Sequence, residues 1–409
     1  MRLHAVGIAL ALAIVLVPAV VATPAKAQDK TFTVLYSFTG GADGGYPYGG
    51  LIRDAAGDLY GTTYGGGSSK CSQGCGVVFM VDKAGNETVL YSFTGTGGDG
   101  GNPFAGLVRD AAGNLYGTTF HGGASGAGTV FNLDNTGKET VLYSFTGLPD
   151  GEGPHAGLLR DAAGNLYGTT EEGGSGACSF GGFDYGCGTV FMLDTAGKET
   201  VLYSFSGTGG DGAVPYAGLV RDAAGNLYGT TSGGGASSEG TVFKLDTTGK
   251  ETVLHSFTGT GRDGTYPYAP LIRDSKGNLY GTTYGGGASG AGMVFKLDSA
   301  GKETVLYSFT GTGGDGAGPM VGLVQDAKGN LYGTTRYGGS FHGVCYQSGG
   351  CGVVFMLDKG GKETVLHKFA GSDGLQPLAG LVRDAKGNFY GTTSEGGASG
   401  FGTVFELTP

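Results

Sequence analysis

The sequence contains no tryptophan, few charged residues and no cluster of basic residues. Only 15% of its 409 residues are charged, which is too few for a chain kept unfolded by charge repulsion. The formal net charge is −10. Nucleic acids and anionic membranes bind basic patches, so we expect neither as a partner. Helix-type hydrophobic periodicity is also absent. Beyond the N-terminal segment, no apolar run is long enough to span a bilayer.

Glycine is instead abundant, with 90 residues, and proline adds 12. This content is typical of disordered or fibrous chains. However, glycine does not recur at every third position, which excludes collagen, and 22 Tyr and 22 Phe can supply a large core. The sequence therefore predicts a globular protein with many tight turns.

The N-terminal 27 residues have the pattern of a secretory signal. Arg2 precedes an apolar run over residues 6–21, and Ala25-Lys26-Ala27 has small residues at the expected cleavage site. An uncleaved membrane anchor is the alternative. We expect residues 28–409 to be exported, as a secreted, periplasmic or cell-envelope protein without a membrane span.

Six cysteines fall into three close pairs, as expected in an oxidising compartment. Local pairing is the simplest of the 15 connectivities. A zinc site would need more ligands, and only His342 lies near a pair. We therefore predict three structural disulfides: Cys71–Cys75, Cys178–Cys187 and Cys345–Cys351.

Two motifs recur seven times along the chain. The string Val-Leu-(Tyr/His)-(Ser/Lys)-Phe begins at seven valines, at intervals of 52 to 60 residues, and the longest intervals contain the cysteine pairs. The string Gly-(Asn/Asp)-(Leu/Phe)-Tyr-Gly-Thr-Thr alternates with it. A period near 52 with strand-type residues and Asp-x-x-Gly turns is typical of β-propeller blades. The valines are Val34, Val89, Val141, Val201, Val253, Val305 and Val365.

The predicted fold is all-β: a single seven-bladed β-propeller of four-stranded blades over residues 28–409. The last repeat stops after a third strand, whereas residues 31–38 form a fourth strand that no blade precedes. We therefore expect the N-terminal strand to complete the last blade and close the ring, which leaves no long exposed edge. The predicted blades are residues 51–93, 107–145, 158–205, 219–257, 271–309, 323–369, and 381–407 with 31–38.

The Leu-x-x-Asp-x-x-Gly-Asn-Leu-Tyr-Gly-Thr-Thr core, flanked by Gly-Thr-Val-Phe and Val-Leu-Tyr-Ser-Phe, resembles the GloVer tandem-repeat family. The resemblance covers nearly all of residues 31–407. The Asp-x-x-Gly-Asn-x-Tyr pattern is similar, more loosely, to NHL-type propellers. The resemblance implies an exported bacterial repeat protein, and it implies no particular activity.

In such a blade, the long strand 2–3 loops and the inter-blade loops share one face, which we call the long-loop face. Variable loops on a rigid scaffold commonly carry function. Each inter-blade loop contains an Asp-Gly, and seven acids around an axis could bind a cation such as Ca²⁺. The alternative is that these acids only form turns. Apart from this possible Ca²⁺, we predict no cofactor, and we assign no metal site. These acids are Asp43, Asp99, Asp150, Asp211, Asp263, Asp315 and Asp373.

Polar residues that break the repeat are further binding candidates on this face, namely His121, Glu171, Glu172, Arg336 and His342. Adjacent residues of a strand point in opposite directions, which weakens Glu171 and Glu172 as a catalytic pair. No residue is assigned a catalytic role. In the absence of Trp, Tyr48, Phe180, Tyr185, Phe341 or Tyr346 could stack on a sugar ring.

The function expected from the sequence is a binding or scaffold module that acts through the long-loop face on an unidentified protein or glycan. Two alternatives stay open. One is an extracellular hydrolase or lyase acting on polysaccharide, and the other is a structural repeat protein of the cell envelope.

Overall fold

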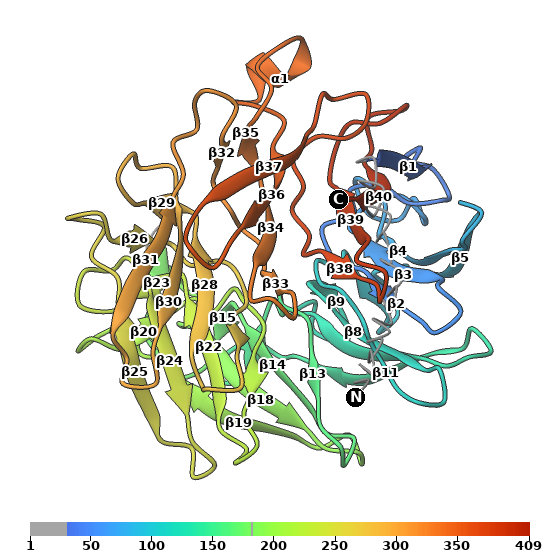
Figure 1. Cartoon of the computed structure of the whole chain (residues 1–409). Helices are drawn as coiled ribbons and strands as arrows, with labels where there is room; N and C mark the ends of the chain where they lie inside the picture. The colour runs from blue at the N-terminus through green and yellow to red at the C-terminus, as the bar shows by residue number, and fades with distance from the viewer. Residues whose placement is uncertain (1–30, 181–182) are drawn as a thin grey trace, which may run out of the picture.

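The computed structural model describes residues 31–180 and 183–409, and seven four-stranded antiparallel sheets surround a central axis in it (Figure 1). The chain is thus a seven-bladed β-propeller, as the repeat predicts. The predicted signal segment, residues 1–27, lies outside the described residues. Within the described ranges, no helix has the length and apolar character of a membrane span.

Each of the first six blades runs from a short inner strand to a longer outer strand. The strands of blades 1, 2 and 3 are β2 (Ile52–Arg53), β3 (Leu59–Thr63), β4 (Val77–Val81) and β5 (Glu87–Ser92); β7 (Val108–Arg109), β8 (Leu115–Thr119), β10 (Thr129–Leu133) and β11 (Glu139–Ser144); β13 (Leu159–Arg160), β14 (Leu166–Thr170), β18 (Thr189–Leu193) and β19 (Glu199–Ser204).

Blades 4, 5 and 6 have the same order. Their strands are β21 (Val220–Arg221), β22 (Leu227–Thr231), β24 (Thr241–Leu245) and β25 (Glu251–Ser256); β27 (Ile272–Arg273), β28 (Leu279–Thr283), β30 (Met293–Leu297) and β31 (Glu303–Ser308); β33 (Val324–Gln325), β34 (Leu331–Thr335), β36 (Val353–Leu357) and β37 (Glu363–Lys368).

Blade 7 joins the two ends of the chain. Its inner strands are β38 (Val382–Arg383), β39 (Phe389–Thr393) and β40 (Thr403–Thr408), and its outer strand is β1 (Thr31–Ser37). β1 and β40 pair antiparallel, with Phe32 opposite Leu407 and Ser37 opposite Thr403. The prediction that the N-terminal strand completes the last blade is confirmed.

The repeated Leu-Tyr-Gly-Thr-Thr strand has a glycine where a neighbouring ring requires it. Gly117 pairs with Phe131 on the next strand, and a Cβ at Gly117 would lie 2.7 Å from Phe131 Cζ. The ring therefore fills the space above the glycine. The preceding tyrosine belongs to the turn: Tyr116 Oη donates to Asp110 Oδ2 at 3.1 Å, which fixes the Asp-x-x-Gly turn.

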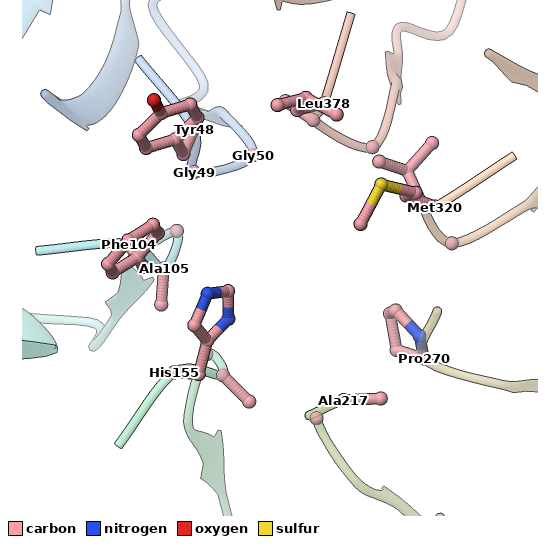
Figure 2. Close-up of a pocket in the computed structure, with 18 of the residues that line it drawn as sticks. Tyr48, Gly49, Gly50, Phe104, Ala105, His155, Ala217, Pro270, Met320 and Leu378 are labelled. Atoms are coloured by element: carbon pink, nitrogen blue, oxygen red, sulfur yellow. The ribbon is translucent and has the colours of Figure 1, made fainter. Parts of the chain in front are cut away.

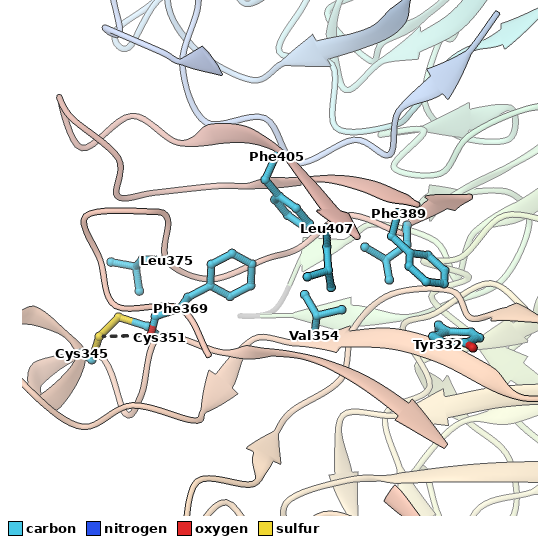
Figure 3. Close-up of a cluster of buried hydrophobic side chains, with 10 residues drawn as sticks. Tyr332, Cys345, Cys351, Val354, Phe369, Leu375, Phe389, Phe405 and Leu407 are labelled. Atoms are coloured by element: carbon cyan, nitrogen blue, oxygen red, sulfur yellow. Dashed lines mark hydrogen bonds between the residues drawn. A yellow bond between two sulfur atoms is a disulfide. The ribbon is translucent and has the colours of Figure 1, made fainter. Parts of the chain in front are cut away.

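Pairs of buried phenylalanines join neighbouring blades. Phe93, which follows the outer strand of blade 1, meets Phe131 of blade 2 edge-to-face, with ring centroids 5.1 Å apart. Equivalent pairs occur at all seven junctions, including Phe369 with Phe405 where blade 6 meets blade 7 (Figure 3). These fully buried rings form the layer that holds the ring of blades together.

The repeated Thr-Thr pairs add polar contacts between blades. The Thr62 hydroxyl donates to the Ala105 carbonyl of the next blade at 2.7 Å, and Thr392 donates to the Pro47 carbonyl across the ring closure at 3.2 Å. Both threonines of each pair are buried. The accepting carbonyls lie in the segments that enter the inner strands, so the first threonine of each pair anchors the inner end of the next inter-blade loop.

Short two-stranded arms, which the sequence did not reveal, link each inter-blade loop to the strand 2–3 loop of the same blade. Blades 1 and 7 have single bridges at these positions, Gly45 with Gly65 and Leu375 with Glu395. The remaining arms are β6 (Gly100–Gly101) with β9 (His121–Gly122), β12 (Gly151–Glu152) with β15 (Glu172–Gly173), β20 (Gly212–Ala213) with β23 (Gly233–Gly234), β26 (Gly264–Thr265) with β29 (Gly285–Gly286), and β32 (Gly316–Ala317) with β35 (Tyr337–Gly338).

All three predicted disulfides are present, and each lies in a long strand 2–3 loop. They are Cys71–Cys75, Cys178–Cys187 and Cys345–Cys351. The second loop also contains a small hairpin, β16 (Ser179–Phe180) with β17 (Phe183–Asp184). The third contains the short helix α1 (Val344–Gln347), and its disulfide packs against Phe369 and Leu375 (Figure 3). The bridges thus connect the long loops to the blade core.

Candidate functional site at the axial mouth

A cavity of about 550 Å³ lies on the propeller axis. Its wall is built from the segments that enter the inner strands, and Arg336, which follows β34, places it toward the long-loop face. Seven equivalent side chains surround it, each three residues before the leucine that directly precedes its inner strand. We call them the axial ring; Figure 2 shows several of them. They are Tyr48, Phe104, His155, Tyr216, Tyr268, Met320 and Leu378.

A residue with a left-handed backbone positions each member of the ring. At Asn102 φ is 55°, its N–H donates to the Cys75 carbonyl of the preceding blade, and its own carbonyl accepts from Phe120 N–H. Val214 has the same conformation, with φ of 58°, and equivalent hydrogen bonds. A left-handed β-branched residue costs free energy. The mouth is therefore held by backbone bonds to both neighbouring loops.

The axial ring is aromatic on one side and aliphatic on the other. Tyr48 stacks on Phe104, with ring centroids 5.2 Å apart, and Phe104 stacks on His155 at 4.3 Å. The series continues through Tyr216, whose ring centroid is 3.5 Å from that of His155, to Tyr268. Leu378, Met320 and Pro270 lie across the opening (Figure 2). All seven ring members stay partly exposed, unlike the phenylalanines between the blades.

His155 brings a polar atom into this aromatic series. Its ring keeps some exposure to the cavity, but protein surrounds it so closely that burial lowers the pKa of His155 to about 3. The ring is therefore neutral at physiological pH. Its Nε2 is buried and has no hydrogen-bond partner among the described residues.

Arg336 and Glu171 occupy equivalent positions directly after the Thr-Thr pairs of blades 6 and 3. Arg336 lines the cavity, its Nε donates to Gln376 Oε1 at 3.1 Å, and its guanidinium lies 4.9 Å from the Tyr337 ring centre. Burial, with a smaller contribution from Glu172, raises the pKa of Glu171 to about 7. The negative charge of Glu171 in turn contributes to the raised pKa of Tyr216, after burial, so this carboxyl lies close to the axial ring.

The other candidates from the sequence lie away from the axis. His121 is exposed on β9, and Glu172 pairs with Glu152 in the β12–β15 arm. His342 is exposed and precedes α1. Tyr185, Phe341 and Tyr346 are exposed on the disulfide loops, whereas Tyr48 lies in the axial ring.

The seven Asp-Gly acids close the inter-blade loops beside the outer strands, and none of them lines the axial cavity. Asp99 Oδ2 accepts from Thr94 N–H at 2.7 Å, and Asp150 Oδ2 accepts from Thr146 N–H at 3.0 Å. Several also contact the outer strand, as when Tyr143 Oη donates to Asp150 Oδ2 at 2.9 Å. They hold the loops in place at some distance from the cavity.

Of the seven axial-ring residues, only Tyr48 was predicted from the sequence, although a signal for the other six exists. In the aligned repeats, the position three before the inner-strand leucine varies while its surroundings repeat, and it is aromatic in four repeats. A variable, often aromatic position inside an otherwise regular repeat is the pattern that would have identified Phe104, His155, Tyr216, Tyr268, Met320 and Leu378.

Two solved structures that match with a TM-score of 0.51 support the fold. The chain matches the extracellular domain of a proposed one-component system from B. thetaiotaomicron with a TM-score of 0.51 and 12% identity, over 87% of this chain and 37% of that one. A puromycin hydrolase matches with a TM-score of 0.51 and 14% identity, over 87% and 52%. A gluconolactonase from Xanthomonas campestris matches with a TM-score of 0.44 and 14% identity, over 93% and 89%.

Sequence comparison identifies a family without assigning a function. A search of the curated proteins finds no significant match to this chain. The model of the Gloeobacter/Verrucomicrobia repeat matches residues 22–180 and 175–346, which is more than half of the sequence. The chain therefore belongs to the Gloeobacter/Verrucomicrobia repeat family.

Proposed function

We propose that this protein is an exported binding module, and that the axial mouth on its long-loop face binds a glycan through a single sugar residue. The observation that carries the proposal is the one-sided stack of rings from Tyr48 through Phe104 and His155 to Tyr216. Ligand sites are typically concave, mostly apolar and equipped with a few polar groups, and the cavity has a typical volume for one.

The chemistry of the wall favours a hydroxylated ring. Partly exposed aromatic faces can pack against the apolar face of a sugar. The neutral His155 Nε2 can accept a hydrogen bond from a sugar hydroxyl, and satisfying a buried acceptor favours ligands that carry a donor. A purely apolar ligand would leave that atom unsatisfied.

Arg336 supplies a positive charge at the cavity wall of a protein whose net charge is −10. We therefore expect a sugar that carries a carboxylate, a uronate, to bind more tightly than its neutral parent. The Arg336 guanidinium can form charge-assisted hydrogen bonds with a carboxylate.

Binding to a panel of neutral and uronate oligosaccharides tests this proposal. We expect a uronate glycan to bind, and we expect Tyr216→Ala to weaken the binding of this glycan at least about tenfold. Arg336→Gln should remove the preference for the uronate and retain binding of the neutral sugar. Tyr346→Ala, on an exposed loop, is the control and should leave affinity unchanged. Binding that survives Tyr216→Ala but is lost with the 178–187 loop would place the site elsewhere on this face.

Glu171 favours a second candidate, a polysaccharide hydrolase or lyase. A carboxyl with a pKa of about 7 can both accept and donate a proton at neutral pH. If the protein turns over a glycan, Glu171→Gln should abolish turnover while binding persists. Absence of turnover of every glycan that binds would eliminate this candidate and leave the binding function.

A further inference from the structure

A second group of polar residues recurs where the outer strands of neighbouring blades meet. At each such outer junction, a Tyr or His from one outer strand contacts the Asp-Gly acid of the following loop. At six of the seven junctions, the first residue of the next outer strand is a glutamate, and its Oε1 is buried without a hydrogen-bond partner in the described residues. The six glutamates are Glu87, Glu139, Glu199, Glu251, Glu303 and Glu363.

At five outer junctions the residue that faces the acid is a tyrosine, and at three of them its hydroxyl donates a hydrogen bond to the carboxylate. Tyr36 Oη lies 3.0 Å from Asp43 Oδ2, and Tyr307 Oη lies 3.2 Å from Asp315 Oδ2. A protonated phenol that uses its hydrogen in this way stabilises the carboxylate. The hydroxyl also fills the space beside the carboxylate.

The junction between blades 4 and 5 has a different composition. Here His255 replaces the tyrosine, and one ligand atom each from His255, Asp263 and Glu303 lie within 4.8 Å of one another. His255 Nε2 lies 3.5 Å from Asp263 Oδ1, beyond good hydrogen-bond geometry. Both His255 Nε2 and Glu303 Oε1 are buried atoms that lack a hydrogen-bond partner within the described chain.

The other histidine junction, between blades 6 and 7, provides an internal contrast. His367 Nε2 makes a hydrogen bond of 2.9 Å with Asp373 Oδ2. The position of the glutamate is taken by Phe32, whose ring stacks on His367 with centroids 3.7 Å apart. This junction therefore has two polar partners that satisfy each other. Only the blade 4–5 junction combines a histidine with two carboxylates among the described residues.

We propose that His255 Nε2, Asp263 Oδ1 and the Glu303 carboxylate bind a divalent transition-metal ion of the zinc type between blades 4 and 5. One imidazole and two carboxylates are a donor set that such ions accept. Donor atoms about 2.1 Å from a tetrahedral ion lie roughly 3.4 Å apart, which is close to the observed separation of His255 Nε2 and Asp263 Oδ1.

Neighbouring contacts already orient two of the three ligands. Asp263 accepts from Thr258 N–H at 2.7 Å and from Gly264 N–H at 2.7 Å. The His255 ring packs edge-to-face on the buried Phe257, with centroids 4.7 Å apart. The side chains of His255 and Asp263 keep 20% and 15% exposure, so the site lies close to the surface although its ligand atoms are buried. The glutamate is the one flexible ligand that must adjust.

Isothermal titration with Zn²⁺, together with the absorption spectrum of the Co²⁺-loaded protein, tests the proposal. We expect one Zn²⁺ per chain and cobalt bands typical of a low-coordinate nitrogen–oxygen site. His255→Tyr restores the residue found at five equivalent positions, so it should fold and should lose zinc binding. His367→Tyr is the matched control and should retain it. Circular dichroism and melting temperatures verify that each variant is folded.

A designed gain of function makes the test stricter. Tyr307→His would place a histidine beside Asp315 and Glu363, which reproduces the proposed ligand set at the next junction. This variant should bind a second Zn²⁺. The proposal is overturned if the folded wild-type protein does not bind Zn²⁺, if His255→Tyr binds it as wild type does, or if folded Tyr307→His gains no ion.

Discussion

The junctions between blades and the axial mouth use the same sevenfold frame in opposite ways. Between blades, every repeat contributes the same phenylalanines, and all of these rings are fully buried. At the mouth, equivalent positions hold Tyr, Phe, His, Met or Leu, and all remain partly exposed. Positions that hold the same residue in every repeat keep the blades packed together, whereas positions that differ between repeats determine which groups line the axial mouth. The comparison teaches that function is best sought where the repeat is broken inside a rigid frame.

The largest expected effect is a difference in stability loss between two phenylalanine-to-alanine substitutions, one in each region. Phe131→Ala should lower the free energy of unfolding by about 3–5 kcal/mol, because it leaves a cavity in a fully buried junction. Phe104→Ala, at the partly exposed mouth, should cost less than about 2 kcal/mol and should weaken glycan binding instead. Denaturant unfolding of both variants measures the difference. Equal destabilisation would remove the distinction between the two regions.

The second expected effect is a loss of stability as pH rises. Burial, and next the nearby Asp-Gly acid, raises the pKa of Glu87, Glu139, Glu199, Glu251 and Glu363 from 4.5 to about 7. The folded state therefore binds more protons than the unfolded state between these values, and stability decreases from pH 4.5 to about 7. These side chains are only partly buried, so solvent screens part of the effect.

We expect a melting temperature at least about 3 °C higher at pH 5 than at pH 7.5, as measured by calorimetry. Glu199→Gln should reduce this dependence, because the amide does not ionise. The turn acids oppose the trend only at lower pH. Hydrogen bonds from the turn hold the pKa of Asp110 below its usual value, despite burial, so their contribution is lost as pH falls below about 4. A melting temperature that rises from pH 5 to 7.5 would contradict the account.

A third prediction concerns the disulfide-containing strand 2–3 loops. Removal of the Cys178–Cys187 bridge by a double Ser substitution should cost roughly 2–3 kcal/mol, as expected from loop-closure entropy for a short loop. Binding at the axial mouth should persist, because neither cysteine lines the cavity. Calorimetry of the double Ser variant measures the loss of stability, and glycan titration measures its binding. Loss of binding without loss of stability would transfer the site to this loop.

The smallest expected effect is a stabilisation. Val214 is β-branched and has a left-handed backbone with φ of 58°, whereas Asn102 occupies the equivalent position in blade 2. Val214→Asn should raise the free energy of unfolding by about 0.5–1 kcal/mol, because asparagine tolerates this conformation. Denaturant titration measures it, and a clear destabilisation would show that the side-chain packing of Val214 outweighs its backbone strain.

The propeller fold could be predicted well from the sequence because its blades are built from repeated motifs. Seven copies of each motif gave the blade number, and the unmatched strand of residues 31–38 predicted ring closure. The disulfides followed from the proximity of their cysteines. The axial site was harder to predict, because Tyr48, Phe104 and His155 lie in successive repeats, far apart in the sequence, and meet only when neighbouring blades pack around the axis. Glu171 and Arg336 stood out as breaks in the repeat, but their positions near the axis depend on the backbone geometry after each Thr-Thr pair.

A crystal structure of the protein with a bound uronate oligosaccharide tests the central claim most directly. The account predicts electron density for a sugar ring against Phe104, His155 and Tyr216, with a hydroxyl near His155 Nε2 and the carboxylate near Arg336. A sugar bound on the opposite face, where the short Asp-x-x-Gly turns lie, or against the outer strands would contradict it.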